Sequence, residues 1–425
     1  MNLIKQNFKE VKNGGLRIFF RKLKTFIIEI ISLPIYFLAL FILIIIYLLQ
    51  PYYLIRFGNL SSSRLGHFAA DTELYFCEKE AKINIPKQKY LDLFFCRKAS
   101  NNYLAKMWKR ELIVLPSFLL KPIFSLNKFI SSFSSIAEKH IISTTWLDRD
   151  VHNLIDTQKP HLRFTNDEIN KGENFLKKFG LSKTSKFVCL IVRDNAYLKH
   201  LEPGKNWDYH NHRNSDVNNF MDAAEALAAK GFHVFRMGSK VEKKFESKNN
   251  RIVDYANLNE RSDFLDIFLG AHCNFCITTS CGFDAIPYIF RVPIAYITVP
   301  IQYFFASSKK FLIITKHHYS KKTNRKLEFK ELIDMQFGDL NAKSFDDNGI
   351  VLVENSPNEI KEFALEMLER CENRWEDTQE DKKIQLKFWD IYRFFLKKNN
   401  IEYLHGKINA KISTNFLKNN PEWLK

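Results

Sequence analysis

Glycine and acidic residues are scarce in this 425-residue chain, and the second shortage leaves a large charge imbalance. There are 14 glycines, and 47 Asp and Glu residues stand against 64 Lys and Arg, for a net charge of +17. Such a charge attracts anions whatever the fold, so nucleic acid, anionic lipid and phosphorylated substrates are all candidate partners. An A- and T-rich genome also produces a composition rich in Lys, Asn, Ile and Phe, so part of the charge carries no information about function.

Internal repeats, low-complexity tracts and nucleic-acid-binding modules are also lacking. The basic residues are scattered and no aromatic platform accompanies them, so we expect no nucleic-acid partner. Cysteine pairing is lacking as well, because the seven cysteines are odd in number and mostly lie among apolar residues, which is typical of free thiols in a reducing compartment. Cys273 and Cys276 have metal-ligand spacing but no second ligand pair, so we expect neither a metal nor a cofactor.

The first 51 residues combine a basic head with a long apolar run. Residues 1–24 carry seven Lys and Arg and one acid, and only Glu29, Ser32 and Pro34 interrupt the apolar run from Phe26 to Leu49. About 20 apolar residues span a bilayer core, and the run lacks a signal-peptide cleavage site. The sequence therefore predicts a membrane helix in residues 1–51. A break at Pro34 favours a re-entrant or interfacial segment that keeps the rest of the chain in the cytoplasm, whereas a simple crossing would export it.

Beyond residue 51, strands and helices alternate as in an α/β protein. Expected strands cover residues 54–57, 90–96, 111–115, 187–192, 232–235, 251–255, 274–278, 294–299 and 311–315. Expected helices cover 67–80, 101–110, 165–179, 217–228, 262–271 and two amphipathic stretches after residue 357, the second at 382–396. The pattern predicts Rossmann-like domains at 52–170 and 171–355, followed by C-terminal helices at 356–425 that pack back across the body.

The stretch from Asp208 to Ser239 is the strongest candidate for a ligand site. Its first nine residues include Asp208, His210, His212, Arg213, Asn214 and Asp216, far more polar groups than a turn requires. The expected helix and strand that follow deliver Arg236, Met237 and Gly238 into a loop. Ligands bind beyond the carboxyl ends of strands in open α/β sheets, so these residues are expected at a binding site.

Two other strand ends carry candidate phosphate ligands. Arg193 follows the strand at 187–192, where its guanidinium either grips a phosphate or pairs with Asp194. The turn at 278–285 offers Thr279 and Ser280 hydroxyls, Gly282 for close backbone approach, and Asp284 to accept from a sugar hydroxyl. The alternative is an ordinary β/α turn.

The serine-rich loop at residues 61–66 leads into His67 at the start of an expected helix. An imidazole can accept and release a proton near neutral pH, so His67 is a candidate general base. The alternative is a residue that caps or packs on the helix.

Three stretches resemble a family of bacterial glycosyltransferases of the GT-B type: RLGHFAADTELYF at 64–76, DYHNHRNSDVNNF with FHVFRMGS at 208–239, and TTSCGFDAIPYIFRVP at 278–293. The resemblance covers the chain from about residue 52 to the closing FLKNNPEWL. It implies two Rossmann-like domains, with a nucleotide-sugar donor held mainly by the second and the acceptor and catalytic base supplied mainly by the first.

The resemblance also assigns roles to residues. Arg193 resembles a phosphate-binding arginine, and Ser280, Gly282 and Asp284 resemble a donor-binding turn. Distant relatives such as heptosyltransferases have an acidic base after a glycine, where this chain has His67 after Gly66. No DXD-type metal motif is evident, which fits a leaving diphosphate stabilised by basic side chains and a helix dipole.

Together these features predict a membrane-associated glycosyltransferase of the bacterial inner membrane with a cytoplasmic catalytic domain. It would transfer sugar from a nucleotide-sugar donor to a surface-polysaccharide or lipid-linked glycan acceptor. His67 is the expected base, with His210 or His212 as rivals. The expected donor ligands are Arg193, Arg213, Asp216, Arg236, Gly238, Thr279, Ser280, Gly282 and Asp284. The alternatives are a nucleotide-sugar epimerase of the same fold and a non-catalytic, membrane-tethered scaffold for glycan assembly.

Overall fold

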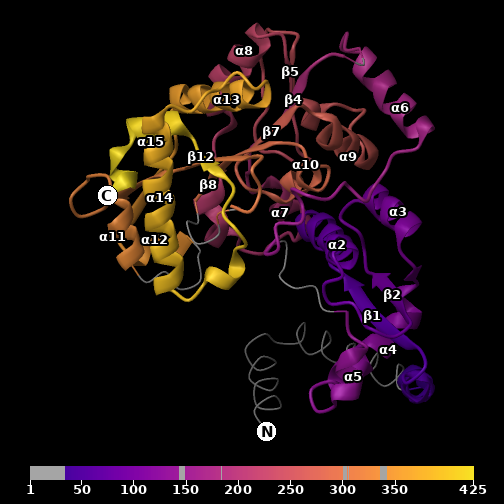
Figure 1. The fold of residues 1–425 in the computed structure, drawn as a ribbon. Helices are drawn as coiled ribbons and strands as arrows, with labels where there is room; N and C mark the ends of the chain where they lie inside the picture. The colour runs from indigo at the N-terminus through magenta and orange to yellow at the C-terminus, as the bar shows by residue number, and fades with distance from the viewer. Residues whose placement is uncertain (1–33, 143–148, 183, 300–303, 305, 336–341) are drawn as a thin grey trace. The chain divides into compact units, whose positions relative to one another are not determined.

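The computed structural model describes residues 34–425 except 143–148, 183, 300–303, 305 and 336–341 (Figure 1). Contacts divide the chain into two compact units. Unit 1 comprises Met1–Leu60, Asn84–Arg97 and Leu112–Ser143, and unit 2 comprises Ser61–Ile83, Lys98–Glu111 and Thr144–Lys425. The units alternate along the first part of the chain, and the domains expected at 52–170 and 171–355 stay a prediction.

Unit 1 is built on a three-stranded parallel sheet, in the order β1 (Leu54–Leu60), β2 (Tyr90–Cys96) and β3 (Val114–Leu115). Arg56 and Asp92 lie opposite each other on β1 and β2, and Arg56 Nε donates to Asp92 Oδ1 over 2.7 Å. A buried guanidinium and carboxylate are tolerated here because each satisfies the other.

Three helices accompany this sheet: residues 34–49, α4 (Ser117–Ile130) and α5 (Ser135–Lys139). The first eight residues of the expected apolar run, 26–33, lie outside the described residues. The remainder is helical. Among the described residues, no helix combines the length and hydropathy that a bilayer crossing requires.

Unit 2 is built on a seven-stranded parallel sheet in the order β12-β9-β8-β7-β4-β5-β6. Its strands are β4 (Phe187–Ile191), β5 (His233–Arg236), β6 (Ile252–Val253), β7 (Phe275–Thr278), β8 (Ile294–Thr298), β9 (Phe311–Thr315) and β12 (Lys411–Ile412). Strand order runs outward in one direction from β4 to β6 and in the other from β7 to β9. The sheet therefore reverses between β4 and β7, as in a doubly wound Rossmann fold.

Helices cover both faces of this sheet. Those of unit 2 are α2 (Leu65–Glu80), α3 (Asn102–Glu111), α6 (Asn166–Lys177), α7 (Ala196–Leu201), α8 (Met221–Ala229), α9 (Asp263–His272), α10 (Ala285–Ile289), α11 (Phe329–Asp334), α12 (Ala342–Asp347), α13 (Pro357–Cys371), α14 (Gln379–Lys398) and α15 (Thr414–Asn419). Short 3-10 helices are η1 (Asp208–Arg213), η2 (Val217–Phe220), η3 (Tyr255–Asn257), η4 (Gly282–Asp284), η6 (Glu402–Leu404) and η7 (Pro421–Leu424). Helix α13 packs against α8, whereas α9 packs against α3, α6 and α10 (Figure 1).

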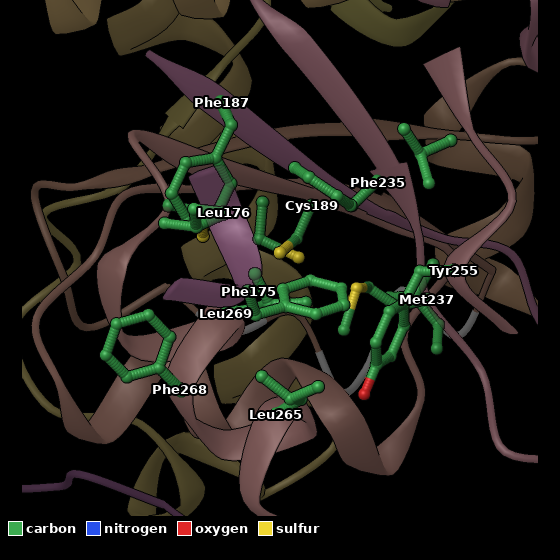
Figure 2. Close-up of a cluster of buried hydrophobic side chains, with 14 of the residues drawn as sticks. Phe175, Leu176, Phe187, Cys189, Phe235, Met237, Tyr255, Leu265, Phe268 and Leu269 are labelled. Carbon is green, nitrogen blue, oxygen red and sulfur yellow. The ribbon is translucent and has the colours of Figure 1, made fainter. Parts of the chain in front are cut away.

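The core of unit 2 lies between α6, α9 and strands β4 and β5 (Figure 2). Phe175 from α6, Phe268 from α9 and Phe235 from β5 converge there with Cys189 of β4, and all are buried. Aromatic side chains bury large apolar areas, so this cluster fixes the strands whose carboxyl ends carry the candidate ligands.

Most expected strands and helices are confirmed, and three differences concern the site. The expected helix at 217–228 begins as η2, with Asp216 as its cap. The polar loop before it contains η1. Strands β10 (His317–Ser320) and β11 (Ile350–Val353) form an antiparallel pair that was not expected, and β12 extends the main sheet.

Candidate functional site

The candidate site lies where the main sheet of unit 2 reverses direction. Arg193 follows β4, and the turn from Thr279 to Gly282 follows β7, which is the neighbouring strand. The two segments touch, because the Arg193 N–H donates to Thr279 Oγ1 over 2.7 Å. Ligands of doubly wound sheets bind at this reversal point, so the fold brings the two predicted ligand segments together where binding is expected.

The turn after β7 holds its shape by bonding to itself. Asp284 accepts hydrogen bonds from the Cys281 N–H and the Thr278 hydroxyl, at 2.9 and 3.2 Å. Asp284 therefore takes part in the capping box of η4, and its expected role toward a sugar hydroxyl stays a prediction. Ser280 has a left-handed backbone, with φ of +57°, and its buried Oγ has no hydrogen-bond partner among the described residues. A strained residue with an unsatisfied hydroxyl is typical of a ligand contact.

Arg193 and Arg213 place two guanidiniums next to this turn. Arg213 donates to the Ser280 carbonyl, and burial together with the charge of Arg213 lowers the pKa of Arg193 to about 10. Asp194 lies beside them, but its carboxylate accepts from the backbone N–H groups of Ala196 and Glu242. In the described part of the chain neither guanidinium pairs with a carboxylate. Two half-buried like charges without an ion-pair partner among the described residues make this a candidate anion site.

His210 lies within the same cationic surroundings. Burial, followed by the charges of Arg193, Arg213, Arg64 and Lys205, lowers its pKa to about 4. Its imidazole is therefore neutral at pH 7 and can serve as a hydrogen-bond partner or a weak base. The ring contacts Tyr209 with centroids 4.0 Å apart.

A second β/α turn lies against the first. A Cβ placed on Gly66 would meet Gly282 Cα at 3.2 Å, and one on Gly282 would meet Gly66 N at 3.1 Å. The two backbones are thus in direct contact, which only residues without side chains allow. The contact brings the start of α2, and with it Arg64 and His67, to the same edge as the Ser280 turn.

His67 lies in the first turn of α2 with Asp71 one turn further along. The His67 Nδ1 atom is 3.5 Å from Asp71 Oδ1, and Asp71 is buried. A carboxylate this close to an imidazole is in position to influence the orientation of the ring, as the carboxylates beside general-base histidines do. The structure thus gives His67 a possible partner that sequence reasoning did not identify.

Arg236 was expected to bind phosphate, but the structure gives it a different surrounding. Its side chain is 1% exposed, and its Nη1 is 3.1 Å from Asp254 Oδ1. The strand pattern did not reveal that the last residue of β5 points into the core. We therefore leave Arg236 out of the proposed anion site.

Three further candidates have structural contacts of their own. Asp216 caps η2 and pairs with Lys243, whose Nζ is 2.6 Å from its carboxylate. His212 is buried against Phe345, and burial with the charge of Arg213 lowers its pKa to about 3. Gly238 has φ of +151°, so it supplies a backbone turn. None of these observations places the three at the anion site.

Two cations that sequence reasoning missed belong to the site. The charges of Arg64 and Lys205 both contribute to the lowered pKa of His210, and sequence reasoning gave neither residue a role. Arg64 lies in the quoted stretch RLGHFAADTELYF, so proximity to Gly66 was the available signal. Nothing in the sequence around Lys205 indicated that it would lie near the site.

One group of side chains has the chemistry of a metal site. Single ligand atoms of Glu73, Cys77 and His161 all lie within 4.8 Å of one another. Arg291 Nη2, however, is 2.6 Å from the Glu73 carboxylate, and burial raises the pKa of the Cys77 thiol well above its usual range. A protonated thiol and a paired carboxylate are poor ligands, so this group fits a buried ion-pair network better than a metal.

Comparison with known proteins gives weak similarities. No family model matches the chain, and no curated protein matches it. The structure of Escherichia coli ADP-heptose lipopolysaccharide heptosyltransferase II is 14% identical, with 76% of this chain and 99% of that one covered and a TM-score of 0.41. A family 9 glycosyl transferase from Veillonella parvula is 14% identical, with 75% and 98% covered and a TM-score of 0.44. At these scores the function must be argued from the chain's own residues.

Proposed function

We propose that the chain is a glycosyltransferase of the GT-B type that transfers sugar from a nucleotide-sugar donor to a glycan acceptor. The observation that carries the proposal is the pair of guanidiniums, Arg193 and Arg213, at the sheet reversal with no carboxylate partner among the described residues. A nucleoside diphosphate supplies the negative charge that this pair lacks. The unsatisfied hydroxyl of Ser280 supplies a further donor.

The residues support a simple transfer step. An acceptor hydroxyl attacks the anomeric carbon of the donor sugar and loses its proton to the base, while the bond from that carbon to the diphosphate oxygen breaks. The electron pair leaves with the nucleoside diphosphate. Arg193 and Arg213 stabilise the charge that develops on the leaving oxygen, as preorganised cations in a buried site do.

His67 is the proposed base, oriented by Asp71. It lies at the start of α2, beside the glycine contact that brings this helix to the anion site. His210 is the rival, and its depressed pKa makes it the weaker base, since a base with a pKa of about 4 gains little from accepting a proton near pH 7.

The acceptor and location follow the sequence-based expectation. We propose a surface-polysaccharide or lipid-linked glycan as acceptor, at the bacterial inner membrane with the catalytic part in the cytoplasm. All seven cysteines are free, which supports a reducing compartment.

The test compares Arg193→Gln with the unchanged protein in nucleotide binding. Calorimetry with ADP, UDP and GDP identifies the nucleotide, which should also raise the melting temperature, because a ligand bound by the native state stabilises it. Loss of a charged hydrogen-bond donor costs about 1.5–3 kcal/mol, so the affinity for that nucleotide should fall by roughly ten- to a hundredfold. Folding stability should hold or increase, because the substitution relieves repulsion between Arg193 and Arg213.

The matched control is Arg393→Gln, on an exposed face of α14, which should leave nucleotide affinity unchanged. Equal affinity in the Arg193 variant, or no binding of any nucleoside diphosphate by the unchanged protein, would contradict the proposal. Product analysis with nucleotide sugars separates the alternatives. Sugar on an acceptor supports the transferase, an epimerised free nucleotide sugar indicates the epimerase, and binding without turnover of any donor indicates the scaffold.

A further inference from the structure

Large apolar side chains are exposed mainly on unit 1. Among the described residues, 25 large hydrophobic side chains are exposed, and 17 of them belong to this smaller unit. Scattered apolar residues are normal on a protein surface, but a concentrated set on one unit marks an interaction surface.

The exposed set comes from two neighbouring helical segments. Residue Leu43 of the helix at 34–49 and Leu120 of α4 belong to one buried cluster with Phe57 and Phe95 of the sheet. The Tyr47 hydroxyl also donates to Asn127 Oδ1 of α4 over 2.7 Å. The two helices thus pack together over the same strands, and Figure 1 shows α4 beside β1 and β2. Their inner faces pack on the strands, and among the described residues their apolar outer faces are exposed.

The outer face of unit 1, as defined here, consists of the side chains that these helices and α5 leave exposed. On residues 34–49 they are Ile35, Phe37, Leu38, Leu40, Phe41, Ile44, Ile45, Leu48 and Leu49, and on α4, α5 and the turn between them they are Phe118, Leu119, Phe129, Phe133 and Ile136. Phe118, Phe129 and Phe133 are 71%, 67% and 69% exposed. Phe129 and Phe133 contact each other edge to face, with centroids 5.5 Å apart.

The charge around this face has one dominant sign. The described part of unit 1 contains seven Lys and Arg but only two acids, Asp92 and Glu138. Asp92 is neutralised by Arg56 within the sheet. Lys121 and Lys128 of α4 and Lys139 of α5 are exposed beside the apolar side chains. The chain before residue 34 adds seven further basic residues between positions 1 and 24.

We propose that unit 1 docks on an anionic lipid bilayer through its outer face. Apolar and aromatic side chains enter the headgroup and acyl boundary, and the lysines remain with the phosphates, which is how interfacial helices bind membranes. The cationic surroundings select anionic lipid over a neutral apolar partner. This inference extends the proposed function by naming the docking surface, and its test does not require transferase activity.

The experiment is flotation of the full chain with vesicles of phosphatidylcholine alone and of phosphatidylcholine with a quarter phosphatidylglycerol. The unchanged protein should float with the anionic vesicles and bind neutral ones more weakly. The triple variant Phe118→Ser, Phe129→Ser, Phe133→Ser should lower partitioning about tenfold or more, because each lost ring removes apolar area from the interface. Lys121→Glu with Lys128→Glu should lower binding to the anionic vesicles by a similar factor, since each basic residue contributes near the surface.

The matched control carries Leu386→Ser, Phe394→Ser and Tyr403→Ser, three side chains of unit 2 that are 61%, 61% and 55% exposed. It should float as the unchanged protein does. Binding that is unaffected by the triple phenylalanine variant, or equally reduced in the control, would overturn the proposal. A dimer in sedimentation velocity that the phenylalanine variant disrupts, with no vesicle binding, would assign the face to a second copy of the chain.

A second readout separates insertion from adsorption. Phe129→Trp should show a blue-shifted emission with anionic vesicles and quenching by brominated acyl chains, because the indole enters the bilayer boundary. Phe394→Trp, on α14, should show neither change. The absence of quenching in the Phe129→Trp variant while the protein floats would contradict docking through this face.

Discussion

Two arginines of unit 2 show why the partner of a buried charge decides its role. Arg236 and Arg193 both follow strand cores and both looked like phosphate ligands in the sequence. Arg236 pairs with Asp254, which also accepts from the Phe245 N–H over 3.0 Å. Arg193 pairs with no carboxylate in the described chain. A buried guanidinium that is paired with a carboxylate is costly to unpair, whereas one without a carboxylate partner is available to an anionic ligand.

Replacing Arg236 by methionine should therefore affect stability and leave nucleotide affinity unchanged. Breaking a buried ion pair by removing one partner leaves an uncompensated charge, here Asp254, and we expect a loss of about 2–4 kcal/mol in the free energy of unfolding. Urea unfolding measures the loss, and calorimetry at a temperature where the variant is folded measures binding. A variant with normal stability and no nucleotide binding would show that Arg236 belongs to the anion site after all.

His212 makes the stability depend on pH. Its pKa is lowered from 6.5 to about 3 by burial and by Arg213, so the unfolded chain binds this proton more readily than the folded one. Stability should therefore fall as the pH drops below the unfolded value, and His212 should account for roughly 1–2 kcal/mol of the loss between about pH 7 and pH 5.

Thermal or urea unfolding of His212→Phe across this range tests the assignment. Phenylalanine suits a position packed against Phe345 and does not titrate, so the acid-dependent loss should shrink by that amount. An identical pH profile in the variant would show that other groups cause the acid sensitivity.

At the scale of elements, the contact between Gly66 and Gly282 joins two β/α turns that are far apart in sequence. Gly282→Ala adds a Cβ at 3.1 Å from Gly66 N, closer than ordinary packing allows, so the turns must separate by a few tenths of an ångström. We expect a fall of roughly tenfold in nucleotide affinity, because small displacements of binding groups are costly. Calorimetry measures the fall.

The control for this variant is Gly349→Ala. Gly349 has φ of +66° with open space around its Cβ position, so alanine there costs roughly 1 kcal/mol in stability through backbone strain alone. Its nucleotide affinity should be unchanged. Equal affinities in the two variants would indicate that the glycine contact does not shape the site.

Local patterns in the sequence predicted single helices and strands better than they predicted which elements pair with each other. The helix expected at 165–179 and the strand expected at 187–192 are present at 166–177 and 187–191, because the signals for helix ends and apolar runs act within a few residues. Strand β12 was not predicted, because a strand of two residues has no periodic pattern and forms only when it pairs with β9 in the folded chain. The turn after β7 was predicted as a ligand site, but its helix is short, η4 followed by α10. In the proposed site the guanidiniums, and not a helix dipole, would therefore stabilise the bound anion.

At the scale of the whole molecule, the net charge of +17 becomes informative only when it is placed in the fold. The net charge predicted an anionic partner without distinguishing a nucleotide from a lipid, because it does not say where the basic residues gather in the fold. Folding gathers Arg64, Arg193 and Arg213 from distant segments around His210. It leaves another excess of lysine on unit 1, beside apolar side chains. Composition alone could not distinguish the nucleotide proposed for the arginines of unit 2 from the anionic lipid proposed for the lysines of unit 1.

The pairing of β12 with β9 has a consequence for the order in which the chain is made. Strand β9, Phe311–Thr315, leaves the ribosome long before Lys411–Ile412. The edge of β9 that β12 will occupy therefore stays unpaired while α13 and α14 are synthesised. An unpaired edge strand in which four of five residues are apolar is a template for intermolecular pairing. Nascent chains that stall in this interval would be prone to aggregate, and a stop codon just before residue 411 would be more damaging than the loss of so short a strand suggests.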